Sequence, residues 1–275
     1  DSNNGWRGDG YASGFGSGST GASGSANAIG IDSASGSSSN GASGIDLASG
    51  SASATGSGRG LTSWSRRPPA RPALFPTAAG PLSAEGLPLV PRGRFKVVID
   101  PGHGGPDPGA VGINGLRETD VVLDVSLQVA QILQAKGIQV LLTRTSEVDV
   151  DLPPRVALAN NSRADLFLSI HANALSMSRP DVNGIETFYF QDGPSRRLAE
   201  AVQQQMVRVS PGSPDRGARP GRFFVIRRTV MPAALAEMGF VTGQLDSPRL
   251  ADPAFRRRMA VAIATGLLNY LIANP

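Results

Sequence analysis

From residue 94 onward, short apolar segments alternate with segments in which apolar residues recur at helical spacing. This alternation constrains the fold most, because strands and helices that follow one another in turn form layered sheets with helical connections. Strands are expected over residues 94–99, 139–143, 166–170, 185–190, 222–226 and 233–237. Helices are expected over residues 122–133, 155–161, 194–209 and 253–272. The order predicts an α/β three-layer sandwich, with a mostly parallel six-stranded sheet flanked by helices.

The chain before this alternation has a different composition. Residues 1–60 are mostly Gly, Ser, Ala and Asn, and the residues that follow are rich in Pro and Arg. A stretch with so little apolar surface cannot offset the conformational entropy that is lost when it becomes ordered. We therefore expect residues 1–92 to be a disordered low-complexity linker and residues 93–275 to form one folded domain.

Composition also excludes several classes of protein. The chain has no cysteine, so it has neither a disulfide framework nor a thiolate metal site. No apolar run reaches the roughly 18 residues of a membrane span. The net charge of +4 comes from an excess of arginine, but no nucleic-acid-binding motif accompanies it. We expect no nucleic-acid partner, and the start at Asp1 suggests that an upstream part with any export signal was removed.

The chain has two histidines, and each follows an apolar segment that is expected to be a strand. His103 lies in a glycine-rich loop after the first of these strands, and His171 ends the third. Sites in α/β proteins gather beyond the carboxyl ends of the strands. Two histidines and one carboxylate there would form the ligand set that is typical of hydrolytic zinc sites.

Three acidic residues could supply the carboxylate. Glu118 is favoured because it begins the first expected helix, although acidic residues in a first turn also complement the helix dipole. Asp107 and Asp100 are alternatives, and Asp100 could instead hold one histidine tautomer from behind. The residues by themselves leave this choice open.

Glu237 is a candidate for the acid or base of a reaction at this site. It ends the apolar segment 233–236, where an unpaired carboxylate is costly and burial raises its pKa. The alternative is an ion pair with an arginine from the segment before it. That segment could contact substrate carboxylates or form a solvated face, and its arginines are Arg216, Arg219, Arg222, Arg227 and Arg228.

Several motifs of the chain, in this order, resemble the zinc-dependent N-acetylmuramoyl-L-alanine amidase family. The first is Val-Val-Ile-Asp-Pro-Gly-His-Gly-Gly-Pro-Asp-Pro-Gly-Ala, over residues 97–110. The others cover residues 142–144, 164–173, 184–186 and 235–240. The resemblance extends over about residues 94–272 and implies that residues 93–275 are an amidase catalytic domain.

The resemblance also implies the roles of the site residues. It places one zinc ion on His103, Glu118 and His171, with Glu237 as the catalytic acid and base. It implies hydrolysis of the amide between N-acetylmuramic acid and the L-alanine of the peptidoglycan stem peptide. A periplasmic or cell-envelope location, a role in wall remodelling or cell separation, and a monomer with wall-binding domains missing upstream are expected with it.

Some members of the family carry a long insertion whose helix plugs the zinc site. Here only residues 191–193 separate an expected strand from the next expected helix, so an open site without an autoinhibitory helix is expected. Two other functions are compatible with such a metal site. One is a non-catalytic module that binds the cell wall, and the other is a zinc carboxypeptidase that acts on stem peptides.

Overall fold

The computed structural model describes residues 86–275. The linker that is expected over residues 1–92 therefore lies almost entirely outside the described residues. The strands are β1 Lys96–Pro101, β2 Gln139–Leu142, β3 Leu166–Asn173, β4 Ile185–Tyr189, β5 Asp215–Pro220 and β6 Ala233–Phe240. The helices are α1 Glu118–Ala135, α2 Leu152–Ser162, α3 Pro194–Arg208, α4 Phe224–Arg228, α5 Asp246–Ala251 and α6 Pro253–Ala273, with a 3-10 turn at Ile113–Gly115.

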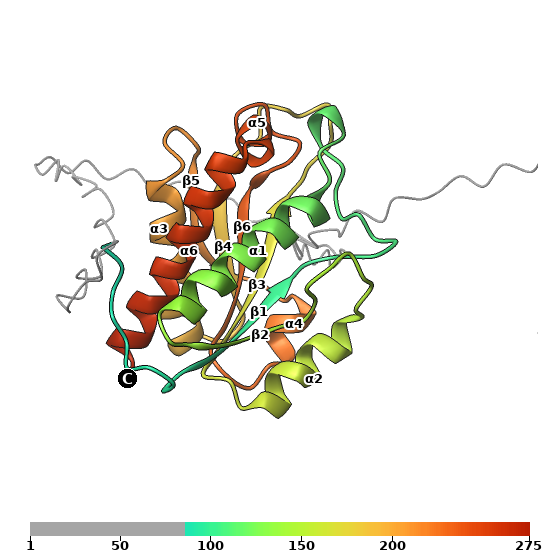
Figure 1. Cartoon of the computed structure of the whole chain (residues 1–275). Helices are drawn as coiled ribbons and strands as arrows, with labels where there is room; N and C mark the ends of the chain where they lie inside the picture. Colours follow the sequence, from blue (N-terminus) through green and yellow to red (C-terminus); the bar gives the residue numbers. More distant parts are fainter. Residues whose placement is uncertain (1–85) are drawn as a thin grey trace, which may run out of the picture. The chain divides into compact units, whose positions relative to one another are not determined.

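The strands form one twisted six-stranded sheet in the order β2-β1-β3-β6-β4-β5 (Figure 1). All neighbouring pairs are parallel except β4 and β6, which are antiparallel. The expected α/β fold with a mostly parallel sheet is confirmed. Because β1, β3 and β6 run in the same direction, their carboxyl ends meet at one edge of the sheet.

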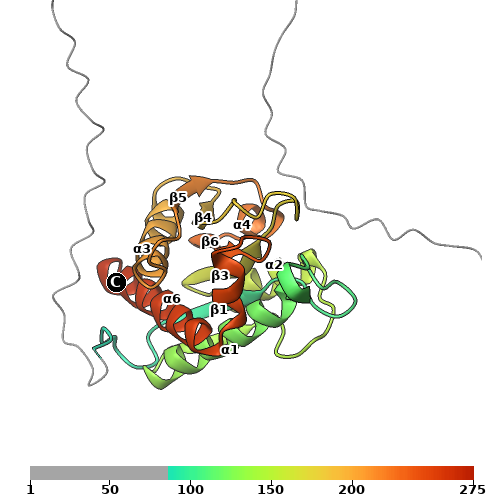
Figure 2. The same ribbon diagram turned by 90° about the horizontal axis from the view of Figure 1, so that it is seen from above.

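Helices cover both faces of the sheet, which makes three layers. Figure 2 shows α1, α6 and α3 on one side of the strands and α2 and α4 on the other. The first face holds the larger core, in which apolar residues of α1, α3 and α6 pack on the strands. The second face holds a smaller core beneath two short helices. The apolar periodicity of each long helix is thus explained by burial of one side against the sheet.

The strand that was expected over residues 222–226 is wrong. The fifth strand is β5, and residues 224–228 form the short helix α4 instead. β5 pairs only with β4 at the edge of the sheet, so its sequence has no apolar run to mark it. The apolar residues that suggested a strand, Val225 and Ile226, are buried in the smaller core from a helical turn.

Two features complete the domain. Leu87 and Val90 are buried in the larger core, so packed residues begin before position 93. Asp252 caps α6, because its carboxylate accepts hydrogen bonds from the amides of Ala254 and Phe255. Within residues 86–275, no helix combines the length and the apolar character needed to cross a bilayer.

Candidate metal centre

His103 lies in the tight loop that follows β1, and a carboxylate of the same loop holds its ring. The backbone of His103 has a φ of 58°, a left-handed conformation that is uncommon outside glycine. Its Nδ1 is 2.8 Å from Oδ2 of Asp107, and Oδ1 of Asp107 accepts a hydrogen bond from the amide of Gly109. Asp107 therefore fixes the orientation of the imidazole and leaves Nε2 to face the interior of the site.

Asp100 does not have the role beside histidine that was considered for it. Its buried carboxylate accepts hydrogen bonds from Thr143, Ser169 and the guanidinium of Arg155. Asp100 lies on the face of the sheet that α2 covers, where Arg155 of α2 pairs with its carboxylate at 2.9 Å.

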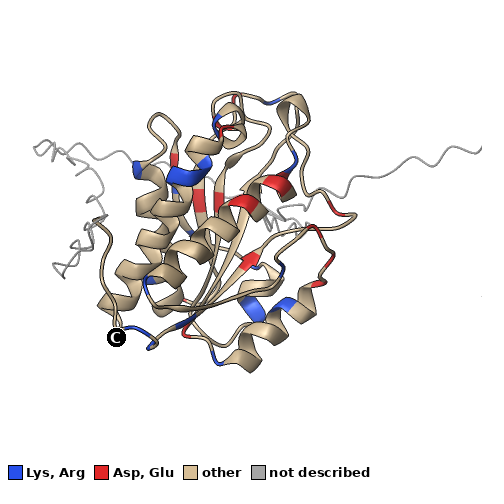
Figure 3. Ribbon diagram, in the orientation of Figure 1, with Lys and Arg blue, Asp and Glu red and all other residues tan. Residues whose placement is uncertain are grey.

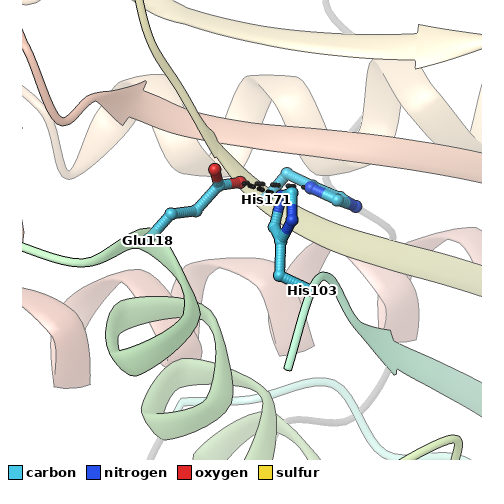
Figure 4. Close-up of side chains that lie close together, drawn as sticks. All are labelled: His103, Glu118 and His171. Atoms are coloured by element: carbon cyan, nitrogen blue, oxygen red, sulfur yellow. Dashed lines mark hydrogen bonds and ion pairs between the residues drawn. The ribbon is translucent and has the colours of Figure 1, made fainter. Parts of the chain in front are cut away.

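Glu118 is the carboxylate that meets both imidazoles (Figure 4). It is the first residue of α1 and is buried. Its Oε1 lies 3.1 Å from Nε2 of His103 and 3.1 Å from Nδ1 of His171. Backbone amides hold the carboxylate in place: Ala172 donates to Oε1 and Ala110 donates to Oε2, each at 3.0 Å.

His103, Glu118 and His171 come from three separate elements and offer one ligand atom each within 4.8 Å of the others. In a tetrahedral zinc site with bonds of about 2.0–2.1 Å, neighbouring ligand atoms are roughly 3.3 Å apart. The 3.1 Å separations from Glu118 to the two imidazoles are close to this value. The donor set, two imidazoles and a carboxylate, is one that zinc uses in hydrolytic sites. The residues present fit such an ion.

Two glycines are required by the close packing of these side chains. The ring of His171 lies over Gly102, where an added Cβ would come within 2.2 Å of its Cε1. At Gly109, which has a φ of +63°, a Cβ would be 2.7 Å from Glu118 Oε2 and 2.8 Å from His103 Cδ2. Both positions therefore need a residue without a side chain.

The charges of the cluster favour a cation. Burial alone would raise the pKa of Glu118, but hydrogen bonds and charge from His103 and His171 hold it well below its usual range. Burial alone would lower the pKa of His103, but Glu118 and Asp107 outweigh it and raise that pKa to about 9. Glu118 is thus an ionised carboxylate, and the proton on His103 supplies a positive charge beside it, as a bound metal would.

Glu237 lies beside this cluster on β6. It is directly opposite His171 of β3 and Glu186 of β4, so the three side chains share one face of the sheet. Burial raises the pKa of Glu237 well above its usual value, and the negative charges of Glu118 and Glu186 add to this. Among the described residues, its Oε2 has no hydrogen-bond partner. No described arginine pairs with it, in contrast to the alternative considered from the sequence.

The five arginines before β6 do not form one patch. Arg216 and Arg219 of β5 lie against the carboxylate of Glu186, at 3.2 and 3.0 Å. Arg222 and Arg228 stack on aromatic rings instead, over Phe190 and Phe224. Sequence reasoning did not single out Glu186, although a carboxylate inside the apolar strand 185–189 was a signal of the same kind as Glu237.

Sequence reasoning also missed two buried arginines that support the His103 loop. Arg155 donates to the carbonyl of His103 at 2.8 Å and to that of Pro101 at 2.6 Å. Arg144 donates to the carbonyl of Gly102 at 2.6 Å. Nothing in the spacing of these arginines marks them, because their acceptors are backbone atoms.

Comparison with known proteins agrees with this geometry. The sequence profile of the N-acetylmuramoyl-L-alanine amidase family matches residues 97–269. The chain is 41% identical to the N-acetylmuramoyl-L-alanine amidase LytC of Bacillus subtilis over 177 residues, which are 63% of this chain and 35% of LytC. The match thus spans about a third of that relative.

Solved structures give the same result. The amidase AmiC2 of Nostoc punctiforme superposes with a TM-score of 0.63 at 45% identity, covering 66% of this chain and 99% of AmiC2. The catalytic domain of the amidase CwlV from Bacillus (Paenibacillus) polymyxa has a TM-score of 0.62 at 38% identity, covering 65% and 98%. As its motifs predicted, the chain belongs to the N-acetylmuramoyl-L-alanine amidase family.

Proposed function

We propose that this chain hydrolyses the amide bond between the lactyl group of N-acetylmuramic acid and the L-alanine of the peptidoglycan stem peptide. The observation that carries the proposal is the convergence of His103, Glu118 and His171, with Glu237 beside them, one of whose oxygens has no hydrogen-bond partner within residues 86–275. Relatives of similar sequence that bear this activity in their names support the choice of substrate.

A divalent ion, in this proposal zinc, would be held by His103, Glu118 and His171. When bound, zinc polarises the substrate carbonyl and lowers the pKa of water at its open position. Asp107 holds the ring of His103, and the amides of Ala110 and Ala172 hold the carboxylate of Glu118, so two of the three proposed ligands are positioned by neighbouring groups.

Glu237 is proposed to move the proton. Burial and the nearby carboxylates raise the pKa of Glu237, which favours proton uptake by its carboxylate. In its ionised form the carboxylate accepts a proton from the attacking water. It then donates this proton to the nitrogen of the departing L-alanine, which leaves as an amine.

The site is proposed to be open without an activator. β4 connects to α3 through residues 190–193 alone, so no helix is inserted at this connection. We further propose that the protein acts as an exported monomer in the periplasm or cell envelope, in wall remodelling or cell separation. Hydrolysis of peptidoglycan by the purified chain alone would agree with an open site, whereas activity that requires a partner protein would contradict it.

The products of purified peptidoglycan test the proposal. Mass spectrometry should find intact stem peptides with a free L-alanine amino terminus, released by the zinc-loaded chain and not after chelation. Loss of residues only from the carboxyl end of the stem would identify a carboxypeptidase. Binding to peptidoglycan without any release, after zinc reconstitution, would identify a wall-binding module.

A further inference from the structure

A line of polar side chains continues from the metal centre across the sheet. His171, Glu237 and Glu186 are register partners on β3, β6 and β4, and they project from the same face. At about 4.8 Å between strands, Glu186 lies roughly 10 Å from His171 along this line. Figure 3 shows acidic colour on the neighbouring strands in the middle of the sheet.

Glu186 is buried, and neighbouring side chains contact both oxygens of its carboxylate. It is 1% exposed, and its Oε1 accepts a hydrogen bond of 2.6 Å from the side-chain amide of Asn173. The other oxygen accepts a hydrogen bond from Nη1 of Arg219 at 3.0 Å, and Nε of Arg216 lies 3.2 Å from it in an ion pair without a hydrogen bond. One carboxylate therefore faces two guanidinium groups, which leaves an excess of one positive charge.

The excess charge is accessible at Arg219. Its side chain is 51% exposed, compared with 33% for Arg216, whose guanidinium also stacks over Phe240. A guanidinium has several N–H donors, and within residues 86–275 that of Arg219 uses only Nη1, toward Glu186. Its remaining N–H groups present a free edge that suits a bidentate carboxylate.

We infer that Arg219, positioned by Glu186 and Arg216, binds the first free carboxylate of the stem peptide beyond the scissile amide. This inference rests on the proposed function. The carboxyl group of the muramic acid is consumed in the scissile amide, so free carboxylates lie on the peptide side. An extended chain covers about 3.3–3.6 Å per residue, and the residue after L-alanine reaches roughly 7 Å from the cleaved bond. A guanidinium held above Glu186 is within hydrogen-bonding reach of a carboxylate there.

The chain is accordingly expected to prefer stem peptides whose second residue carries a free α-carboxylate over those amidated at that position. The peptide would lie across β6 and β4 toward β5, and the sugar would lie on the opposite side of the metal centre. Arg219 is thus a specificity-determining residue, and it leaves the bond-breaking groups untouched.

The test compares two synthetic muramoyl peptides that differ only in an α-carboxylate or an α-carboxamide on the second residue. The zinc-loaded native chain should have a kcat/KM for the carboxylate peptide that is roughly ten- to a hundredfold higher, the range for a charge-assisted hydrogen bond. Arg219→Gln should remove this preference by lowering the rate for the carboxylate peptide far more than the rate for the carboxamide peptide. Arg219→Lys keeps a positive charge beside Glu186 but cannot donate two parallel hydrogen bonds, so it should retain part of the preference.

The matched control is Arg222→Gln, which removes an exposed arginine that stacks on Phe190 instead. It should leave the preference unchanged. Equal kcat/KM values of the native chain for both peptides would overturn the inference. An equal loss for both peptides in Arg219→Gln and Arg219→Lys would also overturn it, because it would indicate a structural role.

Equilibrium binding of the two free peptides, without the sugar, separates this inference from the proposed function. Tighter binding of the carboxylate peptide by the native chain, lost in Arg219→Gln, would support the anion site even if neither muramoyl peptide were cleaved. Equal binding of both peptides would overturn it, whatever the turnover.

Discussion

Glu118 and Glu237 are carboxylates on either side of His171, yet their surroundings are opposite. Glu118 lies at the amino end of α1, and two backbone amides and both imidazoles contact it. Glu237 lies in the middle of an apolar strand with one oxygen unpartnered among the described residues and two other carboxylates nearby. The first region lowers a carboxyl pKa and the second raises one. The same residue type is thus held as an anion in one place and favoured in its protonated form in the other, and the proposed function uses the second as a proton carrier.

The largest effect is expected from removing the anion of this pair. Glu118→Ala should abolish both stoichiometric zinc binding and amide hydrolysis, because it removes the one carboxylate that contacts both imidazoles. Metal analysis after dialysis and the peptide-release assay measure the two effects. A full equivalent of tightly bound zinc in this variant would contradict the assignment of Glu118.

A variant of Glu237, the proposed proton carrier, should lose activity without losing zinc. Glu237→Gln keeps the size and removes the titration, so activity should fall about 10²–10⁴-fold while zinc content stays unchanged. The two variants together separate metal binding from proton transfer. If Glu237→Gln also lost its metal, Glu237 would have to be a ligand.

A smaller effect is expected where the loop packs against Glu118. In Gly109→Ala the added Cβ meets Glu118 Oε2 and His103 Cδ2, so zinc affinity should fall by about 10–100-fold. Gly115→Ala is the matched control, because Gly115 also has a positive φ but nothing lies within 4 Å of its Cβ position. Competition with a fluorescent chelator measures both affinities, and equal losses would attribute the effect to backbone strain.

The smallest effect is on stability against pH in the chelated chain. Burial opposes protonation of His103, but Glu118 and Asp107 raise its pKa from 6.5 to about 9. A raised folded-state pKa contributes stability that is complete below about pH 6.5 and is lost as pH rises through about 9. Urea denaturation should show that the free energy of unfolding falls as pH rises over this range. Zinc should abolish the loss, and a stability that rises with pH in the chelated chain would contradict the account.

The fold could be predicted where apolar periodicity is strong. Strands such as β3 and β6 are buried on both faces, and the long helices bury one side each, so both leave a clear pattern. β5 left none, because its residues, Asp-Arg-Gly-Ala-Arg-Pro, are mostly polar and are exposed or only half-buried. The neighbouring apolar residues of α4 then imitated a strand, since a short run does not distinguish the two states.

The sequence indicated the residues that line the candidate site, but it did not indicate the residues that hold them in position. His103, His171 and Glu237 follow or end apolar segments, a position that is visible in the sequence. That Asp107, and not Asp100, holds His103 depends on the conformation of the loop after β1, which the sequence does not show. The contacts of Arg155 and Arg144 with backbone carbonyls are likewise set by tertiary structure alone.

A crystal structure of the zinc-loaded chain, with anomalous diffraction at the zinc edge, tests the central idea most directly. We expect a single strong peak within about 2.0–2.2 Å of His103 Nε2, Glu118 Oε1 and His171 Nδ1, with Glu237 close by and not coordinated. A peak that excludes one of the three, or that has Glu237 as a ligand, would contradict the division of labour between the two carboxylates.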